Sequence, residues 1–322
     1  MKKTLIVLGA GASKSILDFF PTGIELIINM NYHLTIEETT PPPQAGYGKY
    51  LSSMTNTLLD VLGSNYFKHI ATFKTQLWQP VLDYQFRYPR DYEVTPPLID
   101  ALISQKIKAK ELPDEAKNIA KFIIAYLIIG SEHALKDNMT KKFDDENWIN
   151  VLFQKLKSFQ FDTILENLQI VTFNYDRVFE HYSLKLIDKY FNQASIEQKD
   201  RFVSQVKHIY GSLGKLTDVG FGNRNDDIPK MKNAYKKFNL LYEERNILDG
   251  LENSFEQIYF LGFGYDETNL SNLGLKGFTN ATHKIGTGLK FDEKVKENLS
   301  NTYGIKIEDL NCLSFCEKYL SF

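Results

Sequence analysis

The sequence predicts an α/β protein, with a Rossmann-like, doubly wound parallel sheet and a large helical insertion. Short runs rich in leucine, isoleucine and valine recur along the chain, as is typical of parallel strands that helices cover on both faces. Helical patterns separate several of these runs, and this alternation indicates parallel strands joined by helical crossovers. We predict the insertion because a long, mostly helical stretch separates the first strong run from the second.

The strongest strand candidate is residues 4–8 (TLIVL), which run directly into Gly-Ala-Gly-Ala-Ser. The other strand candidates share its apolar character: Leu168–Phe173, Val206–Tyr210, Gln257–Leu261 and, more weakly, Gly304–Ile307. Apolar residues at helical spacing predict the following helices: Glu111–Leu135, Trp148–Phe159, Asp176–Tyr190 and Asp292–Asn301.

These patterns divide the chain into two parts. Residues 1–40 and 160–322 would form the Rossmann-like domain, and residues 41–159 would form a mainly helical lobe. Proline runs at 41–43 and 96–97 mark breaks in the lobe, because proline cannot continue a helix interior. Such a lobe would supply a lid, an oligomer interface or both.

Composition excludes several classes of protein. A net charge of −2 gives no overall attraction to nucleic acid or to an anionic membrane. Two cysteines, Cys312 and Cys316, are too few for a disulfide framework or a four-thiolate zinc site, and we expect no metal. No targeting segment is evident, and the apolar stretch Phe122–Ile129 is shorter than a membrane span, so we expect a soluble, cytoplasmic protein.

The turn after residues 4–8 is the first candidate site. Gly9 and Gly11 permit a tight turn and close approach of a pyrophosphate, whose charge the N–H groups at a helix start stabilise. Ser13 adds a hydroxyl donor. The third glycine of the usual dinucleotide fingerprint is missing, so a tight strand–helix turn without a ligand is the alternative.

Polar residues follow three other strand candidates. Asn174 and Asp176 come at the carboxyl end of their strand, where open α/β sheets bind ligands; alternatively, Asp176 caps the next helix. His208 and Tyr210 lie two apart on one strand, before Gly211 and Ser212, and His208 is either a general base or a structural histidine. The last strand candidate ends in Gly262-Phe263-Gly264, and the following Asp266 either accepts from a ribose hydroxyl or caps a turn.

These four segments, in this order, resemble the Sir2-like (SIR2 domain) family of prokaryotic NAD hydrolases of anti-phage defence. The segment Pro21–Leu26 is similar to the one that follows the glycine loop in these proteins. The resemblance covers parts of 4–30, 168–180, 206–214 and 257–270, and it leaves the insertion unmatched.

The resemblance implies a Rossmann-like NAD domain that cleaves the nicotinamide–ribose bond. It assigns Asn174 to the ribose or the attacking water, and Asp176 to the nicotinamide amide. His208 would take the proton. The resemblance and the strand-end positions together give these NAD-binding residues: Gly9, Ala10, Gly11, Ser13, Tyr210, Gly211, Ser212, Gly262, Phe263 and Gly264.

Two departures from the family pattern bear on activity. Tyr210 stands where the family has histidine before the Gly-Ser pair, so either His208 replaces it or the site binds NAD and turns it over poorly. The four-cysteine zinc ribbon of the deacylases is absent, which argues against deacylation. The resemblance further implies NAD depletion during infection, gated by homo-oligomerisation or by a partner such as an ATPase. The alternatives are an NAD- or ADP-ribose-binding regulatory subunit and a nucleotide-binding scaffold.

Overall fold

The structure is a computed structural model, and it describes residues 1–16, 20–21, 62, 115–138, 146–222, 233–238, 255–275, 278 and 280–322. Contacts divide the chain into two compact units. The first comprises Met1–Phe20, Leu135–Ile209 and Arg245–Phe322, and the second comprises Pro21–Ala134 and Tyr210–Glu244. The first unit contains the whole sheet, and we call it the sheet unit.

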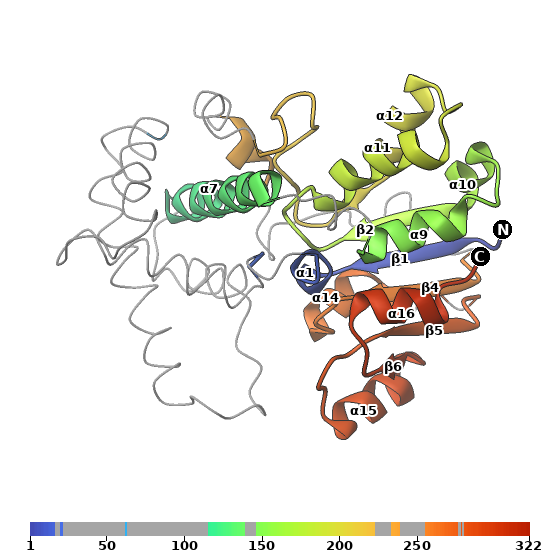
Figure 1. Cartoon of the computed structure of the whole chain (residues 1–322). Helices are drawn as coiled ribbons and strands as arrows, with labels where there is room; N and C mark the ends of the chain where they lie inside the picture. The colour runs from blue at the N-terminus through green and yellow to red at the C-terminus, as the bar shows by residue number, and fades with distance from the viewer. Residues whose placement is uncertain are drawn as a thin grey trace. The chain divides into compact units, whose positions relative to one another are not determined.

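The sheet has six parallel strands in the order β3-β2-β1-β4-β5-β6 (Figure 1). The strands are β1 (Thr4–Leu8), β2 (Leu168–Thr172), β3 (Lys207–His208), β4 (Gln257–Leu261), β5 (His283–Thr287) and β6 (Lys306–Glu308). This order is that of Rossmann folds, in which the chain reverses direction across the sheet between β1 and β4. The predicted fold class, an α/β Rossmann-like fold with a helical insertion, is therefore confirmed.

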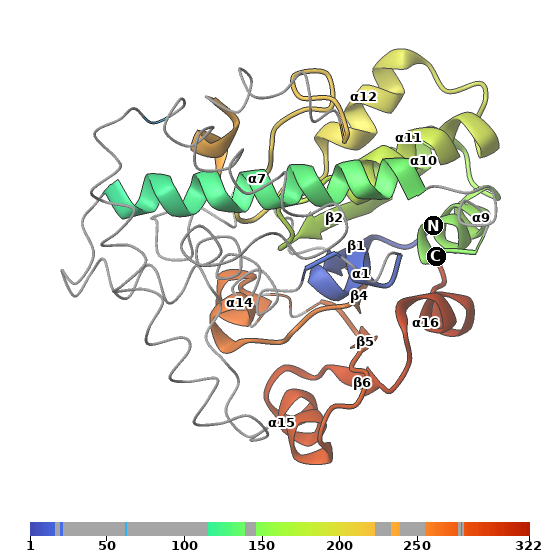
Figure 2. The ribbon, with the colours of Figure 1, turned by 60° about the vertical axis from the view of Figure 1, so that its left-hand side comes forward.

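Helices connect the strands and cover both faces of the sheet. In the sheet unit they are α1 (Ala10–Lys14), α9 (Trp148–Leu156), α10 (Phe161–Asn167), α11 (Val178–Tyr190), α12 (Ile196–Ser204), α14 (Glu267–Asn272), α15 (Glu293–Tyr303) and α16 (Cys312–Tyr319). Helices α9, α11 and α16 lie on one face and α14 and α15 on the other (Figure 1, Figure 2). Burial on both faces explains why β1 and β4 are buried along their length and are apolar after their first residues, Thr4 and Gln257.

Side chains from the covering helices complete the core of the sheet unit. Trp148 of α9 stacks on Phe179 of α11, and its indole N–H donates to Ala12 O at 2.9 Å. Phe315 and Cys316 of α16 are buried, and so is Cys312, which confirms that the two cysteines share a face of a C-terminal helix. Helix α9 is thus tied to the turn after β1 as well as to its neighbouring helices.

Four details differ from the sequence prediction. Strand β5 was not predicted, and β3 has two residues instead of the five of Val206–Tyr210. Helix α9 packs against α11 and α16, so Trp148–Leu156 belongs to the sheet unit and not to an inserted lobe that ends at residue 159. The second unit includes Tyr210–Glu244 as well, which the predicted boundaries assign to the Rossmann-like domain.

Little of the predicted lobe 41–159 falls within the described residues. Its main described element is α7 (Glu115–Asn138), where the sequence predicts a helix over Glu111–Leu135. Among the described residues, Lys117–Lys136 of α7 is the one stretch long and apolar enough to cross a membrane by composition, and most of it is buried inside the protein. A buried core helix meets the same criterion, so this helix is weak evidence for a membrane span. The second unit also contains a short 3-10 helix, η4 (Tyr235–Lys237).

Candidate functional site

The carboxyl ends of four strands meet in one row of the sheet. Leu8, the last residue of β1, pairs with Thr172 of β2 and with Leu261 of β4, and Thr172 pairs with His208 of β3. The segments that follow these strands therefore emerge at the same edge. The glycine turn, Asn174 and His208 thus lie together at the carboxyl ends of separate strands.

Packing of backbone against backbone explains the glycines of the first turn. A Cβ at Gly9 would lie 2.5 Å from Gly262 O, and a Cβ at Gly11 would lie 2.9 Å from Gly262 Cα. The Gly11 N–H donates to Gly262 O at 3.0 Å, and the Gly9 N–H donates to Leu261 O at 3.0 Å. The loop after β4 thus occupies the space that these glycines leave, which supports the ligand-free alternative for part of the motif.

Ser13 connects the first turn to the loop after β2. Its hydroxyl donates to Asp176 Oδ1 at 2.9 Å, and it accepts from Asn174 Nδ2 at 3.1 Å. Asp176 Oδ1 also accepts from the Val178 N–H, the first N–H of α11, at 3.1 Å, but the N-cap residue of α11 is Arg177 and not Asp176 as the alternative predicts. The three side chains are at least nine-tenths buried. Ser13, predicted to line a diphosphate, uses its hydroxyl within this chain of hydrogen bonds.

His208 fixes the main chain of Asn174. Its Nδ1 lies 2.9 Å from Asn174 O, and its Nε2 lies 2.6 Å from Glu180 Oε1 in the first turn of α11. The Asn174 N–H donates to Thr172 Oγ1 at 3.1 Å. Both ring nitrogens therefore face oxygen acceptors. The general-base role of His208 stays a prediction, and it requires one of these two contacts to break.

Two buried acceptors at this edge have no hydrogen-bond partner among the described residues: Asn174 Oδ1 and Glu180 Oε2. Leaving a buried polar atom unpaired typically costs about 1–3 kcal/mol, so a donor from a ligand or from water would stabilise either atom. Because the Asn174 amide nitrogen donates to Ser13, the amide presents its oxygen as an acceptor. A ligand here must bring O–H or N–H donors.

The loop after β4 is held by contacts of its own. Gly262 has φ +57°, and its N–H donates to Thr287 Oγ1 at 2.8 Å. Phe263 is buried and meets Phe173 edge to face with ring centroids 4.9 Å apart. A Cβ at Gly264 would meet no atom within 4 Å. Asp266 accepts from the Thr268 N–H at 2.9 Å and caps α14, which agrees with the capping alternative.

Ala10, also predicted to bind NAD, is the first residue of α1 in the sheet unit, whereas Tyr210, Gly211 and Ser212 belong to the second unit. Tyr210 is buried. Gly211 has φ +74°, and a Cβ there would lie 2.0 Å from Lys237 O, so the local backbone requires glycine. Ser212 Oγ accepts from the Gly214 N–H at 3.2 Å. These contacts explain Gly211 and Ser212 within their own unit, and their predicted role toward NAD stays a prediction.

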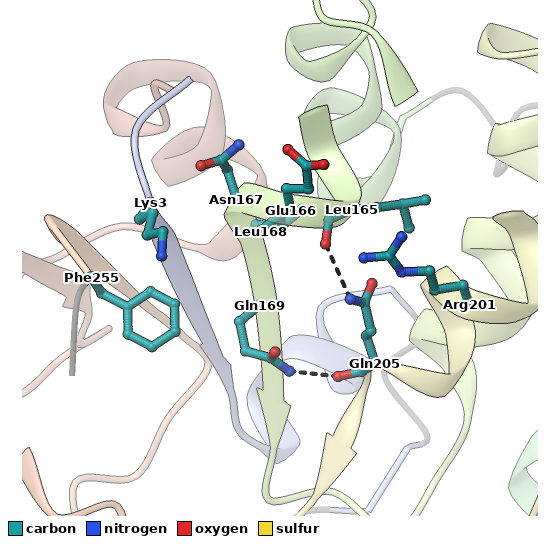
Figure 3. Close-up of a pocket in the computed structure, with 9 residues that line it drawn as sticks. All are labelled: Lys3, Leu165, Glu166, Asn167, Leu168, Gln169, Arg201, Gln205 and Phe255. Carbon is teal, nitrogen blue, oxygen red and sulfur yellow. Dashed lines mark hydrogen bonds between the residues drawn. The ribbon is translucent and has the colours of Figure 1, made fainter. Parts of the chain in front are cut away.

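A pocket of about 280 Å³ lies at the opposite edge of the sheet, where the strands begin. Figure 3 shows Lys3 and Phe255 on one side, Arg201 on the other and Gln169 below. Gln169 Nε2 donates to Gln205 O at 2.5 Å, and Gln205 Nε2 donates to Leu165 O at 3.1 Å. No predicted site residue lines this pocket, so it is separate from the residues at the carboxyl edge.

Within the residues described, no group of three or more histidine, cysteine, aspartate or glutamate side chains is arranged to hold a metal ion.

Burial raises the pKa of the Cys312 thiol to about 11, although hydrogen bonds to Ser15 and Thr287 oppose the rise. This cysteine is thus a protonated core residue near neutral pH.

No known protein-family model matches the chain, and no curated protein matches it.

Proposed function

We propose that this protein hydrolyses NAD⁺ to nicotinamide and ADP-ribose at the carboxyl edge of its sheet. The observation that carries the proposal is Asn174: a buried amide, fixed through main chain and side chain, whose oxygen has no partner among the described residues. The Rossmann strand order, the adjacent glycine turn and the resemblance to Sir2-like NAD hydrolases support NAD as the ligand.

The reaction breaks the C1′–N bond of the nicotinamide ribose, and its electron pair leaves with the nicotinamide nitrogen. A water oxygen bonds to C1′, and the proton goes to solvent. Asn174 Oδ1 would accept from the water or from a ribose hydroxyl and so orient the reacting groups. Because nicotinamide leaves as a neutral molecule and C1′ becomes cationic, the water needs little activation. A neutral His208 acting as base is thus not essential to the scheme.

The test follows free nicotinamide released from NAD⁺ by the purified chain, alone and with any protein that co-purifies with it. Asn174→Ala removes the orienting amide, and we expect release to fall at least about 100-fold. Asn301→Ala, which changes an exposed asparagine on α15, is the matched control and should retain full activity. Equal release by wild type and Asn174→Ala would overturn the assignment.

A second candidate is a regulatory subunit that binds NAD or ADP-ribose without cleaving it. Tyr210 at the family's histidine position favours this candidate. So do the hydrogen bonds of both His208 ring nitrogens to Asn174 O and Glu180 Oε1, because they leave neither nitrogen available as a base. This candidate predicts that NAD raises the melting temperature while no nicotinamide appears in any assembly state. A nucleotide-binding scaffold, by contrast, would show no preference for NAD over ATP.

We also propose that the activity serves anti-phage defence in the cytoplasm by depleting NAD when infection is sensed. An unregulated NAD hydrolase would be toxic to its own cell. Homo-oligomerisation or a partner such as an ATPase would therefore gate the activity, and neither nucleic acid nor membrane would be a direct ligand. Nicotinamide release that rises with protein concentration, in step with assembly measured by light scattering, would support gating by self-association.

A further inference from the structure

Glu180 contacts His208 in the structure, although the sequence analysis does not identify Glu180 as a site residue. Glu180 lies in the first turn of α11, and its Oε1 is 2.6 Å from His208 Nε2. The Glu180 side chain is 7% exposed and the His208 side chain 9%. A carboxylate so deeply buried needs a strong partner, because transfer of an unpaired charge out of water is costly.

The two partners of His208 restrict its protonation. Asn174 O is a carbonyl and can only accept, so Nδ1 must carry a proton. Glu180, when ionised, can also only accept, so Nε2 must carry a proton as well. The arrangement therefore favours an imidazolium paired with a carboxylate, which donates from both nitrogens. Neither nitrogen has a lone pair available to take a proton from water.

We propose that Glu180 is a positioning residue that holds His208 as a double hydrogen-bond donor and thereby fixes Asn174 for the reaction. The proposal rests on the proposed NAD hydrolysis, because it assigns the task of Asn174 in that reaction. Glu180 orients the ring, the ring holds the Asn174 carbonyl, and Ser13 holds the Asn174 amide nitrogen. The amide oxygen is then presented in one orientation.

The charges around His208 agree with this arrangement. Burial alone would lower the pKa of His208, but the carboxylate of Glu180, the hydrogen bonds to Glu180 and Asn174, and the charge of Asp176 together raise it. Glu180 and Asp176, on α11 and the loop before it, are the ionisable groups identified as acting on the ring. Removing the Glu180 charge should therefore let the pKa of His208 fall.

The first experiment reads the ring directly and does not depend on NAD turnover. The full-length protein is labelled with ¹⁵N at its histidine rings, and the His208 signals are assigned by their loss in His208→Gln. We expect both His208 nitrogens to be protonated at pH 7 and to titrate above the ordinary histidine value of 6.5. In Glu180→Gln, which keeps the size of the side chain, titration should move to lower pH.

The second experiment measures nicotinamide release against pH in the wild type, Glu180→Gln and the control Glu297→Gln, an exposed glutamate on α15. If the active form needs a protonated His208, activity falls as the pH rises through the pKa of His208, and Glu180→Gln moves this alkaline decline to lower pH. The Glu180→Gln substitution should also lower kcat by about 10- to 100-fold with less than about threefold change in KM, because the orientation of Asn174 is lost and substrate binding is kept. A histidine base would instead give an acid limb.

The outcomes separate this inference from the proposed function. If His208 is doubly protonated but no NAD is cleaved, the proposed hydrolase function is refuted. The Glu180–His208 pair is then structural, and Glu180 has no positioning role in a reaction. NAD cleavage by a protein whose His208 is neutral at pH 7, with an acid limb that Glu180→Gln moves to lower pH, would overturn the positioning role and establish His208 as the base. NAD cleavage with unchanged kcat and pH profile in Glu180→Gln would also overturn the inference.

Discussion

Ser13 links the turn after β1 to the loop after β2, because one hydroxyl donates to Asp176 and accepts from Asn174. In Ser13→Ala both partners lose a buried hydrogen bond. We expect the free energy of unfolding to fall by roughly 1–3 kcal/mol. Nicotinamide release should fall as well, because the Asn174 amide is then free to rotate. Chemical denaturation and the release assay measure the two effects.

Ser271→Ala provides the control for this prediction, since Ser271 lies on α14 and is exposed. Loss of its hydroxyl should change the free energy of unfolding by less than about 0.5 kcal/mol. If the two alanine variants were equally stable and equally active, the chain of hydrogen bonds through Ser13 would carry neither stability nor orientation.

His181 makes the sheet unit sensitive to acid. Burial, followed by the charges of Lys185, Arg177 and Lys136, lowers the pKa of His181 from 6.5 to about 4. Between these values the unfolded chain binds a proton that the folded protein does not, so stability falls as the pH drops from 6.5 toward 4. A shift of this size corresponds to on the order of 3 kcal/mol. His181→Gln should flatten this acid limb in urea denaturation measured from pH 7 to pH 4, and an unchanged limb would contradict the assignment.

The loop after β4 is the element on which the glycine turn depends. Gly262 has φ +57°, and a Cβ there would lie 2.0 Å from Ala12 N. Gly262→Ala should therefore destabilise the sheet unit by more than the roughly 1 kcal/mol typical of a point substitution, because both the backbone angle and the space forbid it. Gly264→Ala, two residues on and with no atom within 4 Å of its Cβ, should be nearly neutral in the same denaturation experiment. Similar losses in both variants would refute the packing argument.

Strands were predictable where both faces are buried. The runs that form β1, β2 and β4 are apolar almost throughout, and their predicted bounds agree with the structure to within a residue. Strand β5 has the sequence HKIGT, with His283 exposed and Gly286 placed where a Cβ would lie 2.6 Å from Phe260 Cβ. The strand shows no apolar run, because its first residue is exposed and because Phe260 of β4 fills the space where a side chain at Gly286 would lie. Local pattern could not reveal it.

Glu180 was missed for a different reason. A glutamate in the first turn of a helix is ordinarily exposed, where it interacts with the helix dipole. The available signal was spacing: Glu180, Ser183 and Ile187 share one face of α11, and all three are buried. Asn174 was predictable because it follows an apolar strand, and His208 because it lies in a predicted strand that runs into a glycine turn. The hydrogen bonds that join them depend on strand register and on the orientation of α11, which no local pattern specifies.

At the scale of the whole molecule, the chain leaves the sheet unit twice. It departs after Phe20, shortly after the glycine turn, and again after Ile209, directly after β3. The sequence predicts the first excursion from the long interval between two strong strands. The second was not predicted, because Tyr210–Glu244 shows no comparable interval and was assigned to the domain that surrounds it. The contacts within the chain thus assign Tyr210, at the family's histidine position, to a different unit from His208.

The Glu180–His208 pair should also affect the stability of the protein as a whole. Because the pKa of His208 is raised in the folded state, its contribution is fully present below the ordinary value of about 6.5 and is lost as the pH rises through the raised value. Unfolding by urea, followed through the fluorescence of Trp148 in a Trp78→Phe background, should show stability declining on the alkaline side. Trp148 belongs to the sheet unit, so its fluorescence reports the unfolding of the unit that contains His208.

Glu180→Gln should be less stable than wild type near pH 6.5 and should show a flatter alkaline decline in stability, whereas Glu297→Gln should follow the wild type. An alkaline decline of the same slope in Glu180→Gln would mean that other groups cause it.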